Sequence, residues 1–383
     1  MALSLQYSTS NVEGQGESSQ STEQCKKVTI LSIDGGGIRC IIPATILHAL
    51  EKHLQKLDGP NARIANYFDI IAGVSTGSIL TPMLTAPENR RCDKLNWRPS
   101  PKFDASKFVS FYERRGEGIF GNPIFHVREY PKKIKEALQY ILCRFASPIN
   151  WFEAAMAILT RHGPSALRYA VGKELGQVGL QDFRLTDVVL ASSAAPTYFP
   201  PHKIKFKGQE EGFFYGGICA NNPTLAALCE ATKTYGNERN YKNYLVLSLG
   251  TGQVDLTPYS GQGLAEWLFK EVVRKFRFEF LCNRVNDAVE LYMSRLFHCD
   301  GFSKNYLRIQ EYELKGEVEK MDNVSRVNIF NLKNIGQCLL HKNVTVVNPD
   351  TGNLEKLQYY YKDALAEFAQ KLVKEKKNRV PRI

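Results

Sequence analysis

Residues 28–40 read VTILSIDGGGIRC, and this stretch decides the fold. Its first part, 28–34, is a β-branched apolar run of the length expected for a buried strand. Glycines fill 35–37, and a helical pattern follows, with apolar residues three and four positions apart. The members of that stripe are Ala44, Leu47, Leu50, Leu54 and Leu57, and Gly59-Pro60 should end the helix.

The same order of elements occurs a second time. YFDIIAG at 67–73 predicts another apolar strand, and SILTPMLTA at 78–86 predicts a helix that enters the core. A third strand with a glycine turn is expected in NYLVLSLGTG at 243–252. Strands that alternate with helices in this way predict an α/β fold with a mainly parallel, doubly wound sheet in three layers.

The rest of the chain is organised around this sheet. Residues 103–175 are mostly helical in pattern and aromatic-rich, which predicts a cap-like insertion, and FRLTDVVLASSAAPTYFPP at 183–201 predicts a helix and a turn that line the site. A final amphipathic helix is expected in DALAEFAQKLVKEKK. The predicted organisation is a flexible tail at 1–26, one domain at 27–375 and a basic tail at 376–383.

Composition narrows the classes of function. The chain has 383 residues, 43% of them hydrophobic, and nine scattered cysteines without metal-ligand spacing, which predicts reduced thiols in a cytoplasmic protein without metal or cofactor. No signal peptide or membrane span is expected. The net charge of +11 gathers at 126–144 and 371–383. A solvated basic face and an anionic membrane surface both fit this charge, whereas no nucleic-acid motif accompanies it.

IIAGVSTGSIL contains the pattern G-x-S-x-G at Gly73, Ser75 and Gly77. In this pattern the serine sits on a tight strand-to-helix turn, and the flanking glycines leave room for the neighbouring strand and helix. The turn exposes the hydroxyl at a helix N-terminus, which favours developing negative charge. Because a strand is expected before it and a helix after it, Ser75 is the candidate nucleophile. A structural serine in a glycine turn is the alternative.

SIDGGGIRC at 32–40 supplies candidate oxyanion donors. Backbone amides of Gly35, Gly36 and Gly37 are uncovered in such a turn, and Arg39 adds charge or orients the loop. A phosphate-binding loop is the rival interpretation, but the Lys-Ser/Thr of a P-loop is missing.

Together these motifs resemble the patatin-like phospholipase family, and in particular its plant lipid acyl hydrolases. The resemblance runs in order through ILSIDGGGIR, GVSTGS, SSAAPTYFPPH, GGICANNPT, LSLGTG and NYLRIQ. It implies a Ser–Asp dyad, with Ser75 as nucleophile, the 35–39 loop as oxyanion site and an aspartate at 215 as general base. Residue 215 is Tyr215 instead. Cys40 and Ser78 also replace residues that are usually glycine in the family.

The tyrosine changes the expected chemistry, because a phenol is neutral at pH 7 and a carboxylate is charged. Candidate substitute bases are His202, Asp187 and Glu211, with Glu210 beside Glu211 on a loop entering the strand, although none has the dyad spacing.

Three hypotheses follow. The first is an esterase or acyltransferase that acts on a lipid or other ester through Ser75. The second is a repurposed enzyme of plant specialised metabolism, in which Tyr215, Ser75 and the oxyanion loop polarise a carbonyl for cyclisation, elimination or isomerisation. The third is a storage, defence or binding protein without turnover. Oligomeric state is left open.

Overall fold

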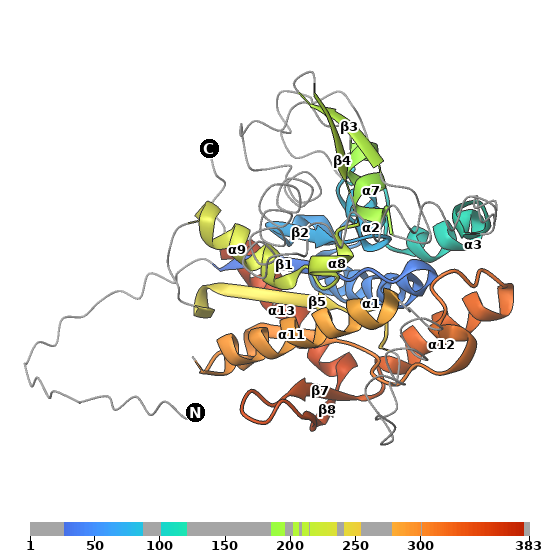
Figure 1. The fold of residues 1–383 in the computed structure, drawn as a ribbon. Helices are drawn as coiled ribbons and strands as arrows, with labels where there is room; N and C mark the ends of the chain where they lie inside the picture. Colours follow the sequence, from blue (N-terminus) through green and yellow to red (C-terminus); the bar gives the residue numbers. More distant parts are fainter. Residues whose placement is uncertain are drawn as a thin grey trace, which may run out of the picture.

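The computed structural model describes residues 27–86, 101–120, 185–195, 202–206, 209–213, 215–235, 241–253, 278–299 and 301–378. Within them, the central sheet is parallel and has the strand order β2-β1-β5-β6 (Figure 1). Its strands are β1 (Val28–Ile33), β2 (Ile70–Gly73), β5 (Tyr244–Leu249) and β6 (Tyr306–Ile309). The predicted α/β fold with a parallel sheet is confirmed.

Alternate residues of each strand face opposite sides of the sheet. Leu31 and Ile33 of β1 join the larger core cluster, whereas Ile30 joins the smaller one on the other face. The larger cluster is packed by the helices α1 (Ile41–Asp58), α3 (Ser106–Phe120), α12 (Arg326–Leu339) and α13 (Tyr361–Asn378). The smaller cluster is packed by α9 (Thr224–Tyr235) and α11 (Phe278–Cys299). The sheet is therefore the middle of three layers.

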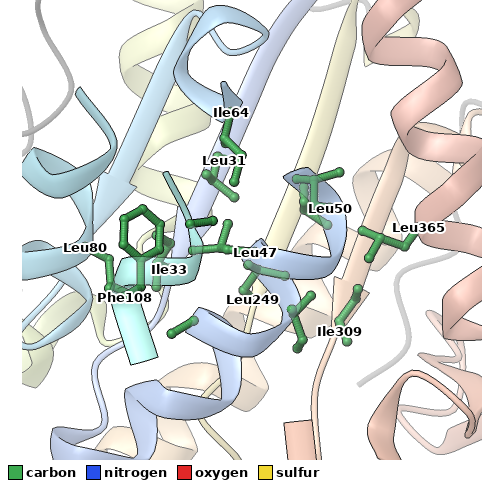
Figure 2. Packing of buried hydrophobic residues seen from close by; sticks show 14 of the residues in the cluster. Leu31, Ile33, Leu47, Leu50, Ile64, Leu80, Phe108, Leu249, Ile309 and Leu365 are labelled. Atoms are coloured by element: carbon green, nitrogen blue, oxygen red, sulfur yellow. The ribbon is translucent and has the colours of Figure 1, made fainter. Parts of the chain in front are cut away.

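Figure 2 shows how the larger cluster closes over the sheet. Leu47 and Leu50 of α1 point toward Leu249 and Ile309, and all of these side chains are fully buried. Truncating one such leucine to alanine typically costs about 2–5 kcal/mol of stability. Burial of this apolar stripe therefore holds α1, the helix that follows the glycine loop, against the sheet.

Helix α1 ends where the sequence predicts. Gly59 takes a φ of 95°, which favours glycine, and its N–H donates to the carbonyl of Gln55. Leu57 was expected in the apolar stripe, but it is 41% exposed. This expectation is wrong, because the buried face of α1 ends at Leu54.

Strand β2 begins at Ile70 and not at Tyr67, so the predicted strand at 67–73 is too long. Asp69 prevents pairing further back, because its carboxylate accepts hydrogen bonds from the amide and the hydroxyl of Thr29 at 2.9 and 3.0 Å. The phenol of Tyr67 meanwhile turns to Asp58 at the end of α1.

Other elements surround the sheet. Two antiparallel hairpins, one at the top and one at the bottom of Figure 1, consist of β3 (His202–Phe206) with β4 (Gln209–Phe213), and β7 (Asn343–Val347) with β8 (Leu354–Tyr360). Short helices are α2 (Gly77–Thr85), α7 (Leu185–Ser193) and α8 (Gly217–Ala220). The 3-10 turns are Gly37–Cys40, Ile64–Asn66, Tyr241–Asn243, Ser303–Asn305 and Gly316–Glu319.

The helix expected at the C-terminal end is present as α13, and its apolar face, including Leu365 and Phe368, is buried. Of the predicted cap region at 103–175, the described part includes α3, which packs Phe108 and Tyr112 into the larger core. The remainder of that region and the basic segment at 126–144 lie outside the described residues.

Candidate active site

Ser75 lies on the turn between β2 and α2 with a φ of 54°. It is the one non-glycine residue with positive φ in the described part of the chain. Such a conformation costs on the order of 1–3 kcal/mol and persists only where the surroundings hold it. The predicted strand–turn–helix context of the elbow is therefore present.

The glycines of the elbow permit a close approach between chain segments. A Cβ atom on Gly77 would lie 2.6 Å from the carbonyl oxygens of both Ile33 and Asp34 at the end of β1. A Cβ atom on Gly73 would lie 2.7 Å from the carbonyl carbon of Gly77. Any side chain at either position would push the serine away from β1.

Three hydroxyl or thiol side chains contact the elbow. Ser192 of α7 accepts a hydrogen bond from the Ser75 amide at 3.1 Å. Ser78 donates to the Ser75 carbonyl at 2.5 Å, and the thiol of Cys40 lies 2.8 Å from the Thr76 hydroxyl. Two of these three residues, Cys40 and Ser78, are the ones that the sequence resemblance predicts to depart from the family pattern, and both contact the elbow.

Two amides of the glycine loop have acceptors elsewhere in the fold, and two have no acceptor among the described residues. Gly35 N–H donates to the carbonyl of Asn221 at 3.1 Å, and Ile38 N–H donates to that of Met321 at 2.8 Å. Among the described residues no acceptor is found for the amides of Gly36 and Gly37. The oxyanion role predicted for Gly35 is therefore not supported by its amide, which is already occupied.

Arg39 is buried, and its Nε donates back to the carbonyl of Gly36 at 3.3 Å. Two roles were predicted for Arg39: to add positive charge to the site or to orient the glycine loop. The hydrogen bond to the Gly36 carbonyl fits the second role.

Tyr215 and Ser75 meet beside Gly35. A Cβ atom on Gly35 would lie 3.0 Å from both the Ser75 Cβ and the Tyr215 hydroxyl, so the three residues line one small space. Tyr215 is 3% exposed and packs with Ala195, Cys282 and Met321.

Burial raises the pKa of the Tyr215 phenol well above its ordinary value of about 10, and the neighbouring Ser75 hydroxyl, which lowers this pKa, does not offset the effect of burial. The group at position 215 is therefore a neutral phenol at physiological pH, and it both donates and accepts hydrogen bonds.

Asn221 connects the tyrosine to the glycine loop. Its Oδ1 accepts from the Tyr215 hydroxyl at 3.2 Å, and its Nδ2 donates to the Gly35 carbonyl and to Asn286 Oδ1, both at 3.3 Å. The Thr251 hydroxyl donates to the same Gly35 carbonyl at 2.7 Å. These bonds fix the carboxamide against the loop.

A buried ion cluster holds the start of the loop. Arg308 of β6 lies between Asp34 and Glu290, with its NH2 group 2.6 Å from Asp34 and its Nε 2.7 Å from Glu290. Burial raises the pKa of Asp34 to about 6, against the attraction of Arg308. The cluster joins β6 and α11 to Asp34, which follows β1 and immediately precedes Gly35.

None of the predicted substitute bases is brought to Ser75 by a described contact. His202 begins β3 opposite Phe213, and Glu211 lies within β4 opposite Ile204. The expectation that Glu210 and Glu211 lie on a loop entering the strand is wrong, because both pair with β3. Asp187 is on α7. The side chains of these residues lie outside the described part, so their role stays a prediction.

The described residues contain no group of three or more potential metal ligands. No helix among them has the length and apolarity needed to cross a bilayer.

A serine elbow beside a glycine loop, at the carboxyl edge of a parallel sheet, is the arrangement that α/β serine hydrolases use. The family model for patatin-like phospholipase matches residues 31–228. The chain is 35% identical to "Patatin-like protein 2" of Oryza sativa subsp. indica, over 95% of this chain and 97% of that protein. It is 32% identical to "Patatin-like protein 3" of Arabidopsis thaliana, over 93% and 91%. It is 34% identical to "Patatin group D-3" of Solanum tuberosum, over 92% and 91%. The chain therefore belongs to the patatin-like phospholipase family.

Sequence reasoning missed several residues of this site. Asn221 lies in the quoted ANNPT segment and Arg308 in NYLRIQ, but neither was singled out. Thr251 lies in the quoted LSLGTG segment and was likewise not singled out, whereas Asn286 carries no sequence signal of its own. A buried asparagine is found only when its partners are known, because the partners come from distant segments.

Proposed function

We propose that this chain is a patatin-like acyl hydrolase or acyltransferase that acts on a lipid or other ester through Ser75. The observation that carries the proposal is the strained, left-handed backbone of Ser75 beside Gly35 and Tyr215. Strain of this kind gathers at functional sites. The substrate class is supported by family membership.

The chemistry follows from the donors around Ser75. The Ser75 oxygen attacks the ester carbonyl carbon, and the carbonyl oxygen gains negative charge next to the amides of Gly36 and Gly37. The serine proton passes to the Tyr215 oxygen while the phenol gives its own proton to the departing alcohol. The carbon–oxygen bond to that alcohol breaks, and an acyl-serine remains. Water or a second alcohol then reverses these steps.

A phenol is a weaker proton acceptor than the carboxylate that the family uses, so turnover should be slow. Losing the base of a serine nucleophile typically costs about 10⁴ to 10⁶ in rate, while oxyanion stabilisation persists. We therefore expect slow acyl transfer, which is faster for esters with good leaving groups than for esters with poor ones.

Hydrolysis of p-nitrophenyl esters and of phospholipid vesicles by Tyr215→Asp and wild-type protein tests this proposal. Restoring the carboxylate should raise ester hydrolysis by at least about a hundredfold. Ser75→Ala should remove activity in both backgrounds. If Tyr215→Asp folds and gains nothing, or if Ser75→Ala retains the activity, the proposal is wrong. Tyr215→Phe serves as the control that removes only the hydroxyl.

A further inference from the structure

The orientation of the Asn221 carboxamide is settled by its surroundings. One of its terminal atoms lies 3.3 Å from the carbonyl oxygen of Gly35. A backbone carbonyl only accepts hydrogen bonds, so that terminal atom is the nitrogen. The same nitrogen also donates to Asn286 Oδ1. The oxygen of the carboxamide therefore faces Tyr215.

This orientation fixes which way the phenol points. An amide oxygen has no proton to give, so Tyr215 must donate in its 3.2 Å contact with Asn221. A phenol carries a single proton. That proton is therefore engaged with Asn221, and the phenol oxygen presents a lone pair to the small space that it shares with Ser75.

We infer that Asn221 is a positioning residue that, before the reaction starts, turns the proton of the neutral Tyr215 phenol away from Ser75, so that the phenol oxygen can accept from the Ser75 hydroxyl. During transfer the phenol proton leaves Asn221 for the departing alcohol as the phenol oxygen takes the Ser75 proton, so the phenol is neutral before and after the step. This inference rests on the proposed function only in taking Ser75 as the nucleophile. Without Asn221 the phenol would turn its proton toward Ser75, whose attacking lone pair would then be engaged. Asn221 thus leaves the tyrosine oxygen free to accept a hydrogen bond from Ser75, which an ionised carboxylate would do without such help.

The arrangement also shows where a carboxylate would complete a relay. An aspartate at 221 would lie one hydrogen bond behind the phenol and accept its proton as Tyr215 takes the proton of Ser75. Its second oxygen would face the Gly35 carbonyl, which keeps the Thr251 hydroxyl as a donor, and Asn286, whose carboxamide would have to turn its NH2 group toward the new carboxylate. The order serine, tyrosine, carboxylate would match that of a serine–histidine–aspartate triad in role.

The test is a double-mutant cycle that measures the rate at which a fluorophosphonate labels Ser75. Asn221→Leu should slow labelling at least tenfold when Tyr215 is present and less than twofold in the Tyr215→Phe background. Asn221→Asp should speed labelling at least tenfold, with a rate that rises as the new carboxylate ionises, and this gain should vanish in Tyr215→Phe.

Asn222→Leu is the matched control. This neighbouring asparagine is also buried, but its Oδ1 accepts from Thr224, and no described contact joins it to Tyr215. Its effect should be equal in the two backgrounds. Equal effects of Asn221→Leu in both backgrounds would overturn the inference, and so would an Asn221→Asp gain that survives without the phenol.

Failure of the inference is distinguishable from failure of the proposed function. If Tyr215→Asp is labelled at Ser75 while the cycle at 221 is additive, the inference falls and the proposed function stands. If no variant is labelled, the proposed function falls. In that case the urea unfolding midpoints of the same single and double variants test the hydrogen bond between Tyr215 and Asn221. Non-additive shifts of the midpoint support this hydrogen bond, and additive shifts overturn it.

Discussion

Arg308 of β6 donates two hydrogen bonds to Asp34, at 3.0 and 2.6 Å, and thereby fixes the residue that precedes the glycine loop. Glu290 of α11 shares the same guanidinium, so two buried carboxylates face one cation. The three charged side chains come from segments that are distant in sequence. Their cluster anchors the loop whose amides lie beside Ser75.

Removing the cation should cost more than removing one carboxylate. Arg308→Met leaves Asp34 and Glu290 buried without a counter-charge and should lower the free energy of unfolding by about 3–5 kcal/mol. Asp34→Asn leaves Arg308 paired with Glu290 and should cost about 1–3 kcal/mol. Urea unfolding measures both. Lys320→Ala, which breaks an exposed ion pair with Glu317, is the control, with a cost below about 1 kcal/mol. The reverse ranking would contradict this account of the cluster.

The pH dependence of stability should carry the signature of Asp34. Its pKa is raised in the native state to about 6, so between about pH 4 and 6 the folded protein holds a proton that the unfolded chain releases. The contribution of Asp34 to stability is therefore full below pH 4 and is lost as the pH rises toward 6. The stability difference between wild type and Asp34→Asn should shrink over this range in urea titrations. A difference that widens with pH would show that Arg308 outweighs burial.

Backbone strain at Ser75 predicts that two inactive variants, Ser75→Ala and Ser75→Gly, differ in stability. Ser75→Ala keeps a Cβ atom at a φ of 54°, whereas Ser75→Gly removes it. Glycine takes this conformation without steric cost, so Ser75→Gly should be more stable than Ser75→Ala by about 1 kcal/mol. Thermal unfolding of the two proteins checks this. Equal stability would mean that the elbow stores no strain.

Two adjacent glycines should differ sharply in their tolerance of alanine. A Cβ atom on Gly217 would overlap the ring of Tyr215 and lie 2.6 Å from its hydroxyl, while one on Gly216 would lie 3.5 Å from Val74. Gly217→Ala should therefore displace the tyrosine and remove the effect of a further Tyr215→Phe change on Ser75 labelling. Gly216→Ala should keep that effect. Labelling rates of the four proteins measure it, and identical behaviour of the two alanine variants would count against the observed ring position.

The parts of this protein that follow from local pattern were predictable. The strand at 28–33, the glycine stop of α1 and the elbow around Ser75 all depend on residues close together in sequence. Spacing rules describe such features well because backbone geometry and the nearest neighbours determine them.

The parts that depend on distant partners were not predictable. The start of β2 at Ile70 is set by Asp69 reaching Thr29, forty positions away. Asn221 gains its role from Gly35 and Asn286, which only the fold brings to it. Tyr215 was identified by resemblance, yet the direction of its hydrogen bond required the position of the asparagine behind it.

The proposed function requires that Ser75 is a nucleophile whose neutral partner is Tyr215. Incubation of the wild-type protein with a fluorophosphonate at neutral pH, followed by peptide mass spectrometry, tests it most directly. We expect a covalent adduct on Ser75 that forms slowly in wild type, faster in Tyr215→Asp and more slowly in Tyr215→Phe than in wild type. An adduct on another residue, or a Ser75 that stays unmodified in both wild type and a folded Tyr215→Asp variant, would contradict it.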